Sequence, residues 1–371
     1  MRRLDIWLMF CIVAVLALPS VGLGWKSARI LAAPGLSAEH PEPAETAWSR
    51  RADIFIATNY GFRKNMVQMS RDIHGALSGT SPRVLYGREG WLFLTDNDVL
   101  SQVTGQRMDV EGLKQFVAMA SGLAAEAKSR GRQFLVTIAP NKHTIYRDKL
   151  PQWASAVPSR TEHDVALPAL ALADVPAVDL RPGLQRSARA HPVYYRGDTH
   201  WTEFGAAIAF NDIVGALGLA DEAIDLDAAF AADVARDSPG DLVKLAGISG
   251  PWIENVPSPR KGTFVADARL ERQVLRKVGD NEFYRLTHKP SAGHPATGPR
   301  VLVIGDSFTA HLFGPMFMRF ASEYVWMHHL GGSIDTALIA ESDPDIVVLE
   351  VVERTLPFFR FRPSQTPSTG G

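Results

Sequence analysis

Residues 300–308 read Arg-Val-Leu-Val-Ile-Gly-Asp-Ser-Phe, an apolar run that ends abruptly in a glycine, an acid and a hydroxyl. The run does not alternate with polar residues, which is typical of a strand buried on both faces of a parallel sheet. Tyr324–His328 and Asp345–Val352 are similar runs, and Phe308–Phe320 and Ile334–Glu341 between them have helical spacing. This alternation predicts an α/β fold with a mainly parallel central sheet.

The same alternation extends toward the amino terminus. We expect a β-hairpin over 84–94, a helix over 109–130, strands over 134–139 and 177–180, and a helix over 202–217. Residues 219–298 are polar and show no clear period, so we expect an irregular insertion there.

Composition and charge exclude several classes of protein. The 371 residues include 39 basic and 40 acidic side chains, a net charge of −1, so a nucleic-acid binder with its basic excess is not expected. The 46% hydrophobic and 21% charged fractions are those of a globular chain. Cys11 is the one cysteine, which excludes a disulfide framework, a zinc ribbon or an iron–sulfur cluster built within one chain.

The amino terminus has the pattern of a membrane segment. Arg2 and Arg3 precede an apolar run from Ile6 to about Leu23, close to the roughly 20 residues that span a bilayer. Basic residues before the run favour a cytoplasmic amino terminus and export of the remainder. We expect an uncleaved transmembrane anchor within 1–25, and a cleaved signal peptide remains the alternative because Gly22 and Gly24 are small.

The exported part follows this segment. We expect a Pro- and Ala-rich linker over 26–48, a catalytic domain over 49–360 and a disordered tail over 361–371. The absence of cysteine beyond Cys11 fits the bacterial periplasm. A single-pass inner-membrane protein with a periplasmic domain is therefore our prediction.

Ser307 is a candidate nucleophile. It follows a buried strand, and the carboxyl ends of parallel strands are where ligands bind in open α/β sheets. Its backbone N–H would face an oxyanion, helped by the dipole of the following helix. The alternative is that Asp306 and Ser307 only cap that helix.

Asp198 and His200, in Tyr-Tyr-Arg-Gly-Asp-Thr-His-Trp (194–201), are candidates for the base. In a tight turn the carboxylate would hold the imidazole Nδ1–H and leave Nε2 free to accept a proton. Alternatively, Asp198 forms a turn and His200 is a bystander. A metal site is the weaker reading, because no His-Glu-x-x-His or similar spacing is present, and we predict none.

Two further strand ends carry candidate residues. Gly331 and Gly332 follow the strand 324–328 and either donate N–H groups to an oxyanion or form a turn with positive φ. Glu353 and Arg354 follow the strand 345–352 and form either an ion pair or part of a pocket wall.

Six stretches resemble the SGNH/GDSL hydrolase superfamily, and in particular its AlgJ/AlgX-type branch of alginate O-acetylation proteins. They are YGREGWLFL (86–94), APNKHTIYRDKLP (139–151), YYRGDTHWTEFGA (194–206), GDLVKLAG (240–247), VLVIGDSF (301–308) and PDIVVLEVVERTL (344–356). Ordinary superfamily members place the Asp and His after the serine, whereas this branch places Asp-x-His before it, as here. The resemblance implies an SGNH-like three-layer sandwich.

The resemblance also implies roles for the site residues. Ser307 would be the nucleophile, His200 the general acid and base, and Asp198 its orienting carboxylate, with Gly331 or Gly332 as the second oxyanion donor. The chain departs from the superfamily at 350–353, where Glu-Val-Val-Glu replaces the common Gly-x-Asn-Asp. The third oxyanion donor is therefore unassigned, and Asn141 is the candidate for it.

The implied activity is transfer of acetyl groups, through an acetyl-serine, to hydroxyls of an exopolysaccharide such as alginate or cellulose. No bound cofactor is expected: a donor or a membrane-embedded acyltransferase partner would supply the acetyl group. Lys142, Arg196 and Arg354 would bind a sugar carboxylate or form structural ion pairs. Trp91 and Trp201 would stack on sugars or lie in the core. A deacetylating esterase and a non-catalytic polymer-binding scaffold are the competing hypotheses.

Overall fold

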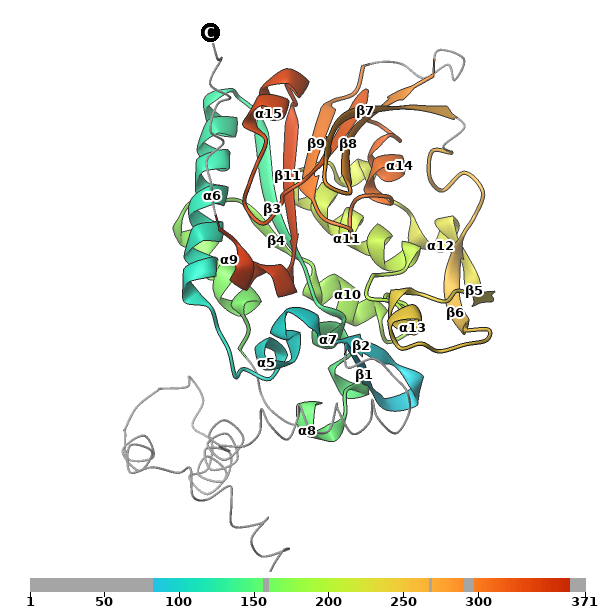
Figure 1. Cartoon of the computed structure of the whole chain (residues 1–371). Coiled ribbons are helices and arrows are strands. Elements are labelled where there is room, and N and C mark those ends of the chain that lie inside the picture. Colours follow the sequence, from blue (N-terminus) through green and yellow to red (C-terminus); the bar gives the residue numbers. More distant parts are fainter. Residues whose placement is uncertain (1–82, 156–159, 267–268, 290–296, 361–371) are drawn as a thin grey trace, which may run out of the picture. The chain divides into compact units, whose positions relative to one another are not determined.

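The structure is a computed structural model that describes residues 83–155, 160–266, 269–289 and 297–360, all within one compact unit of the chain (Figure 1). The anchor, linker and tail expected at 1–25, 26–48 and 361–371 lie outside the described residues. Among the helices that are described, none is both long and apolar enough to cross a bilayer.

A mixed seven-stranded sheet forms the centre of the fold, in the order β4-β3-β11-β9-β10-β8-β7. The strands are β4 (Ala177–Asp179), β3 (Gln133–Ala139), β11 (Ile346–Val352), β9 (Arg300–Gly305), β10 (Glu323–His328), β8 (Asn281–His288) and β7 (Leu270–Val278). Neighbours from β4 to β10 are parallel, and β8 and β7 pair antiparallel at the end. The expected α/β fold with a mainly parallel sheet is confirmed.

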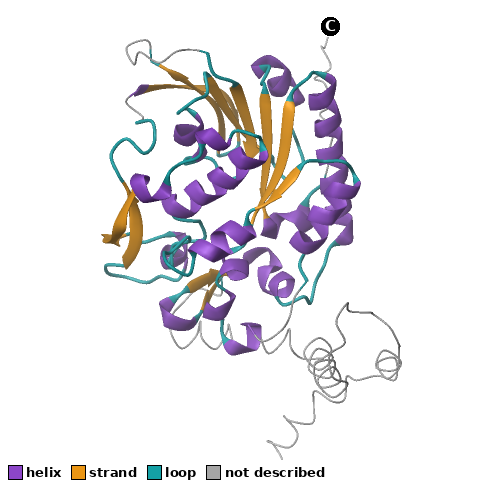
Figure 2. Cartoon of the chain, turned by 180° about the vertical axis from the view of Figure 1, so that it is seen from behind, coloured by secondary structure: helices purple, strands orange, loops and turns teal. Residues whose placement is uncertain are grey.

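Helices cover both faces of this sheet (Figure 2). One face packs against α6 (Val110–Ser129), α9 (Glu162–Leu172) and α15 (Thr336–Ser342); the other packs against α10 (Arg181–Ser187), α11 (Glu203–Ala216) and α14 (Phe313–Phe317). Along β9, Val301 and Val303 belong to the core on the α11 side, and Leu302 and Ile304 to the core on the α6 side. Because both faces are buried, the strand has no polar residue after Arg300.

Smaller elements surround the carboxyl edge of the sheet. They are the hairpins β1 (Val84–Tyr86) with β2 (Leu92–Leu94) and β5 (Phe230–Asp237) with β6 (Ile253–Pro259), and the short helices α5 (Val99–Val103), α7 (Lys142–Ile145), α8 (Gln152–Ser155), α12 (Leu226–Ala229) and α13 (Asp241–Leu245). The hairpin expected over 84–94 is confirmed, with Val84 opposite Leu94.

The segment 219–298 differs from the irregular insertion that we expected. It contains β5 to β8, and β7 and β8 extend the central sheet. Most side chains of β7 are exposed, so the strand needs no apolar run to be stable. An edge strand of this kind carries charged side chains, so its sequence lacks the apolar run by which buried strands are predicted.

The helix expected over Phe308–Phe320 is also shorter in the structure. Residues 307–312 form turns, and α14 covers only Phe313–Phe317. Pro315 has no N–H to donate to the carbonyl of His311, so it is tolerated only in the first turn of a helix. The helix therefore begins six residues after Ser307, and no helix dipole acts at the serine.

Two glycines of α11 allow a matched test of the packing of this helix. A Cβ at Gly205 would lie 2.0 Å from the carbonyl oxygen of Val193, whereas a Cβ at Gly215 would have no neighbour within 4 Å. We expect Gly205→Ala to lower the free energy of unfolding by about 1–3 kcal/mol through overpacking. Gly215→Ala should raise it by about 0.5–1 kcal/mol, because alanine restricts the unfolded chain. Urea denaturation measures both, and equal effects would contradict the packing described.

Candidate active site

The carboxyl edge of the sheet gathers most of the candidate residues. Ser307 follows β9, Gly331 follows β10, Arg354 follows β11 and Asn141 follows β3. Because these strands are parallel neighbours, their ends meet at one edge.

The loop that carries Asp198 and His200 is closed by a two-residue bridge. Tyr194 and Trp201 pair antiparallel, and the N–H of Tyr195 donates to the carbonyl of His200 at 3.2 Å. The loop lies between α10 and α11, far from Ser307 in sequence. Because the bridge closes the loop, the side chains of Asp198 and His200 lie together at its tip.

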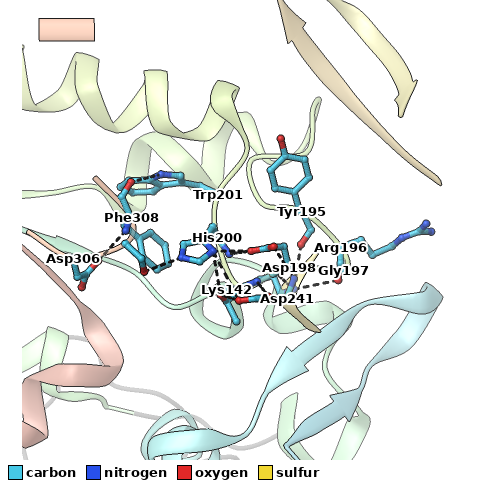
Figure 3. A network of polar contacts seen from close by, with 12 residues as sticks. Lys142, Tyr195, Arg196, Gly197, Asp198, His200, Trp201, Asp241, Asp306 and Phe308 are labelled. Carbon is cyan, nitrogen blue, oxygen red and sulfur yellow. Dashed lines mark hydrogen bonds and ion pairs between the residues drawn. The ribbon is translucent and has the colours of Figure 1, made fainter. Parts of the chain in front are cut away.

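Asp198, His200 and Ser307 form a continuous chain of hydrogen bonds. His200 Nδ1 lies 2.7 Å from Asp198 Oδ1, and His200 Nε2 lies 2.8 Å from Ser307 Oγ (Figure 3). The carboxylate can only accept, so it assigns the ring proton to Nδ1 and leaves Nε2 as the acceptor of the serine hydroxyl. The structure thus brings together the three residues that the sequence singled out.

The pKa of Asp198 is low for a half-buried carboxyl group. Burial alone would raise it, but the hydrogen bonds and charge of His200, with the N–H of Asp241, lower the pKa to about 2. The Asp241 N–H lies 2.9 Å from Asp198 Oδ2, and its carboxylate accepts hydrogen bonds from the N–H and hydroxyl of Thr199. Asp198 is therefore ionised whenever His200 would need a counter-charge.

Asp241 is a residue that the sequence analysis did not assign, although it lies in the resembling stretch 240–247. Asp198, His200 and Asp241 have possible metal-ligand atoms within 4.8 Å of one another. The facing atoms are, however, already joined: His200 Nδ1 to Asp198, and both Asp241 oxygens to Thr199. The set is arranged as a hydrogen-bond network and fits a proton relay better than a metal centre.

Asp306 ties the serine turn to the neighbouring strand. Its Oδ1 accepts from the N–H of Phe308 at 3.0 Å, and its Oδ2 accepts from the N–H of Val352 at 2.9 Å. Burial would raise the pKa of Asp306, but the hydrogen bond and charge of His329, the N–H of Phe308 and the charge of Arg354 hold it well below the usual range. Ser307 is exposed above this turn, and its N–H has no hydrogen-bond partner among the described residues.

Glu350 supports the same turn from β11. Its Oε2 accepts from the N–H of Asp306 at 3.1 Å and from the hydroxyl of Thr309 at 3.3 Å. Burial, and then the charge of Asp306, raise the pKa of Glu350 well above its usual value. A protonated Glu350 can stay beneath the charged Asp306 without repulsion.

The expectation that Gly331 or Gly332 donates to an oxyanion is wrong. Both have positive φ, 64° and 109°, and the backbone turns sharply here. The N–H of Gly331 donates to His329 Nδ1 at 3.0 Å, and that of Gly332 to the His329 carbonyl at 2.9 Å. These N–H groups therefore serve the turn itself.

Asn141 is likewise not placed as an oxyanion donor. It is 1% exposed, its N–H donates to Glu353 Oε2 at 2.8 Å, and its Nδ2 donates to Gln102 at 3.1 Å. Two strand spacings, about 10 Å, separate the ends of β3 and β9. Asn141 and Glu353 belong to a buried polar network that joins β3 to β11.

The three basic candidates occupy very different places. Lys142 is buried and bonds backbone carbonyls, and Arg196 bonds the carbonyl of Ile253 at 2.8 Å and stacks on Trp252. The expectation that Lys142 binds a substrate carboxylate is therefore wrong, and the guanidinium of Arg196 bonds the backbone of β6. Arg354 is half-buried and lies over the ring of Phe308 at 5.3 Å; it forms no salt bridge among the described residues, although its charge helps to lower the pKa of Asp306.

Both tryptophans lie in the core, the second of the two alternatives that the sequence left open, and neither is placed to stack on a sugar. Trp201 is 1% exposed, stacks on Phe313 at 5.8 Å and donates its Nε1–H to the carbonyl of Phe308 at 3.0 Å. Trp91 is buried against Tyr146. Trp201 therefore links the histidine loop to the serine turn through its hydrogen bond to the Phe308 carbonyl.

The sequence of residues 84–326, more than half of the chain, matches the family described as "SGNH hydrolase-like domain, acetyltransferase AlgX". A curated relative is the "Probable alginate O-acetylase AlgJ" of Pseudomonas aeruginosa, 24% identical over 299 residues that cover 78% of this chain and 71% of the relative.

Solved structures have similar folds. Bacillus cereus PatB1 with a sulfonyl adduct aligns at a TM-score of 0.50 and 13% identity, covering 76% of this chain and 97% of PatB1. The O-acetyltransferase domain of Pseudomonas putida AlgJ aligns at a TM-score of 0.47 and 19% identity, covering 75% of this chain and 93% of that domain. At 13% identity the similarity to PatB1 supports the fold alone.

Gly240 allows a test of how tightly Asp198 is held. A Cβ at this position would lie 2.5 Å from the Asp198 Cβ and 2.6 Å from its Oδ2. We expect Gly240→Ala to displace the carboxylate from its N–H donors and to raise its pKa from about 2 toward 3.8. A carboxyl ¹³C NMR titration measures this pKa. Gly122→Ala, with no neighbour within 4 Å, is the control, and an unchanged pKa in Gly240→Ala would contradict the geometry.

Proposed function

The chain belongs to the SGNH hydrolase-like family of AlgX-type acetyltransferases, and from that premise we propose that it is an O-acetyltransferase acting on a polysaccharide. The observation that carries the proposal is the hydrogen-bonded chain from Asp198 through His200 to Ser307. A nucleophile needs a base within hydrogen-bond reach, and the base needs a group that fixes its tautomer. The probable alginate O-acetylase name of the relatives supports the same reaction class.

In the first step, Ser307 Oγ attacks the carbonyl carbon of an acetyl donor. The hydroxyl proton moves to His200 Nε2, and Asp198 stabilises the imidazolium that forms. As the tetrahedral intermediate collapses, the bond to the donor breaks and the leaving oxygen takes the proton from His200. The product is an acetyl ester on Ser307.

In the second step, a sugar hydroxyl attacks the acetyl-serine. His200 Nε2 takes the proton of that hydroxyl, the new ester bond forms, and the proton returns to Ser307 Oγ as the serine leaves. The enzyme is regenerated with no net change of protons, so the reaction requires no cofactor besides the donor.

The N–H of Ser307 is the oxyanion donor that this arrangement offers. It has no other partner among the described residues, and it lies beside the reacting oxygen. The N–H of Phe308 is already used by Asp306. This N–H would donate to the developing negative charge and so help to stabilise it.

We propose that the acceptor is a bacterial exopolysaccharide, alginate or a similar polymer such as cellulose. The AlgJ relatives support an alginate-type acceptor. Arg354, which forms no salt bridge among the described residues and lies over Phe308 of the serine turn, is the guanidinium that would contact a uronate carboxylate.

We also propose a cellular location and a source of the acetyl group. The apolar run after Arg2 and Arg3 favours an inner-membrane anchor and a periplasmic catalytic domain. A membrane-embedded acyltransferase partner would deliver the acetyl group across the bilayer, and an anchored enzyme would be held near that exit.

A transfer assay tests the function. The protein is incubated with a soluble acetyl ester and either oligouronide or cello-oligosaccharide, and the acetylated sugar, free acetate and acetyl-Ser307 are followed by mass spectrometry. We expect acetylated sugar with wild-type protein. Ser307→Ala should lower the rate by about 10⁴-fold or more, because the nucleophile is lost.

Ser333→Ala is the matched control, since this exposed serine lies at the neighbouring strand end. It should keep the wild-type rate. Free acetate without acetylated sugar would indicate an esterase, and transfer that survives Ser307→Ala would indicate a non-catalytic role for this chain.

The acceptor can be examined at Arg354. We expect Arg354→Met to raise KM for oligouronide about tenfold or more, the effect of losing a charge-assisted hydrogen bond, and to leave KM for cello-oligosaccharide unchanged. Arg130→Met, before β3 and so at the opposite edge of the sheet, is the control. An equal change for both sugars would refute a carboxylate contact.

A further inference from the structure

Lys142 has an unusual place for a lysine. It is 3% exposed and lies beneath the loop that carries Asp198. Its Nζ donates to the carbonyl oxygens of Tyr195, Arg196 and Asp198 at 3.1, 3.2 and 2.6 Å (Figure 3). Three acceptors match the three donors of one ammonium group, so Lys142 is fully satisfied by one short stretch of backbone.

Glu254 of β6 holds the same stretch through its N–H groups. It is also 3% exposed, and its two carboxylate oxygens accept from the N–H groups of Arg196 and Gly197, each at 2.7 Å. Trp252 Nε1 donates to the same carboxylate at 2.8 Å. Lys142 therefore donates hydrogen bonds to the carbonyl groups of this loop, and Glu254 accepts hydrogen bonds from its N–H groups.

No space is left for the loop to shift. A Cβ at Gly197 would lie 2.4 Å from Trp252 Nε1 and 2.6 Å from a methyl of Val243. Asp198, whose carbonyl accepts from Lys142, is the residue that orients His200. Fixing the backbone of 195–198 thus fixes the imidazole with respect to Ser307.

We propose that Lys142 and Glu254 are positioning residues that hold the 195–198 backbone so that His200 reaches Ser307, and that the charged form of Lys142 is required for this. The inference rests on the proposed function, since it concerns the same histidine and serine. Neither side chain touches the reacting atoms, so both act through the backbone that they bond.

Stability alone does not explain why Lys142 and Glu254 are both buried. Removing two charges from water opposes folding, and replacing a buried pair by apolar groups is often neutral or stabilising. Burial lowers the pKa of Lys142 to about 7, against the charges of Glu254, Asp198 and Asp241, which raise it. The adjacent His143 has its pKa lowered to about 3 by burial and adds no charge at neutral pH.

Loss of the Lys142 proton would undo the arrangement. A neutral amine has two N–H donors for three carbonyls, and its lone pair then faces one of the oxygens. We therefore expect the reactivity of Ser307 to fall as the pH rises through about 7, where Lys142 loses its proton.

Sulfonylation of Ser307 in the full chain measures this without an acetyl donor. Phenylmethylsulfonyl fluoride forms a bond from Ser307 Oγ to sulfur, fluoride leaves, and His200 takes the hydroxyl proton, so the rate reports the His200–Ser307 geometry. Intact-mass spectrometry follows the rate from pH 5 to 9 for wild-type, Lys142→Met and Glu254→Gln, each corrected for reagent hydrolysis.

We expect Lys142→Met to react 10- to about 100-fold more slowly, the cost of a small misplacement of a catalytic base, and to lose the alkaline fall. Its thermal unfolding midpoint should fall, because three buried carbonyls lose their donor, so all rates are compared at a temperature well below the midpoint of each variant. Glu254→Gln should move the alkaline fall to lower pH, because the charge that sustains the ammonium is removed. Lys128→Met, an exposed lysine of α6, should match the wild type.

The outcomes separate the two proposals. If wild-type Ser307 is not sulfonylated, the proposed function fails. If it is, and Lys142→Met has the wild-type rate and pH profile, the positioning proposal is overturned. Should Lys142→Met fail to fold, Glu254→Gln decides, because an unmoved alkaline fall refutes the role of the pair.

Discussion

The hydrogen bond between His200 and Ser307 joins two loops that are 107 residues apart in sequence, and the rest of the site is arranged to keep it. On one side, the 195–198 backbone lies between a buried acid and a buried base. On the other, the carboxylate of Asp306 anchors the serine turn to β11. A hydrogen bond tolerates little change in length, so both loops must be fixed independently.

Buried charges in this site bond mostly to peptide groups. Glu254 accepts two backbone N–H groups, Glu353 accepts one together with hydroxyls of Thr144 and Thr161, and Lys142 donates to three carbonyls. Such bonds orient loops that have no regular structure of their own. They also satisfy buried polar groups that would otherwise cost about 1–3 kcal/mol each. These bonds hold the backbone of the loops that bear the reactive side chains.

Buried strands and the residues of the hydrogen-bonded chain could be predicted from sequence because each has a local signal. β9, β10 and β11 are apolar runs, and Asp198, His200 and Ser307 lie in stretches that resemble a known family. β7 was missed because an exposed edge strand carries charges, and β8 because polar residues interrupt its buried apolar ones. The acceptors of Lys142 come from residues more than fifty positions away, so spacing alone did not distinguish it from a surface cation. Gly331 and Gly332 were misassigned because a glycine turn has the same sequence whether its N–H groups are free or used.

The net charge of −1 is compatible with an anionic polymer only if a few cations remain available near Ser307. Three basic residues were expected there. Lys142 bonds the backbone of the histidine loop and Arg196 bonds the backbone of β6, so Arg354 is the one of the three that could contact the polymer. One guanidinium supplies one carboxylate contact, which orients a uronate but gives limited discrimination against a neutral sugar. Selection among polymers would then depend more on the location of the enzyme and on the proteins near it than on the charge of the site. The proposed membrane anchor would lower the affinity that the enzyme needs for its polymer, because a chain made nearby would be at high effective concentration.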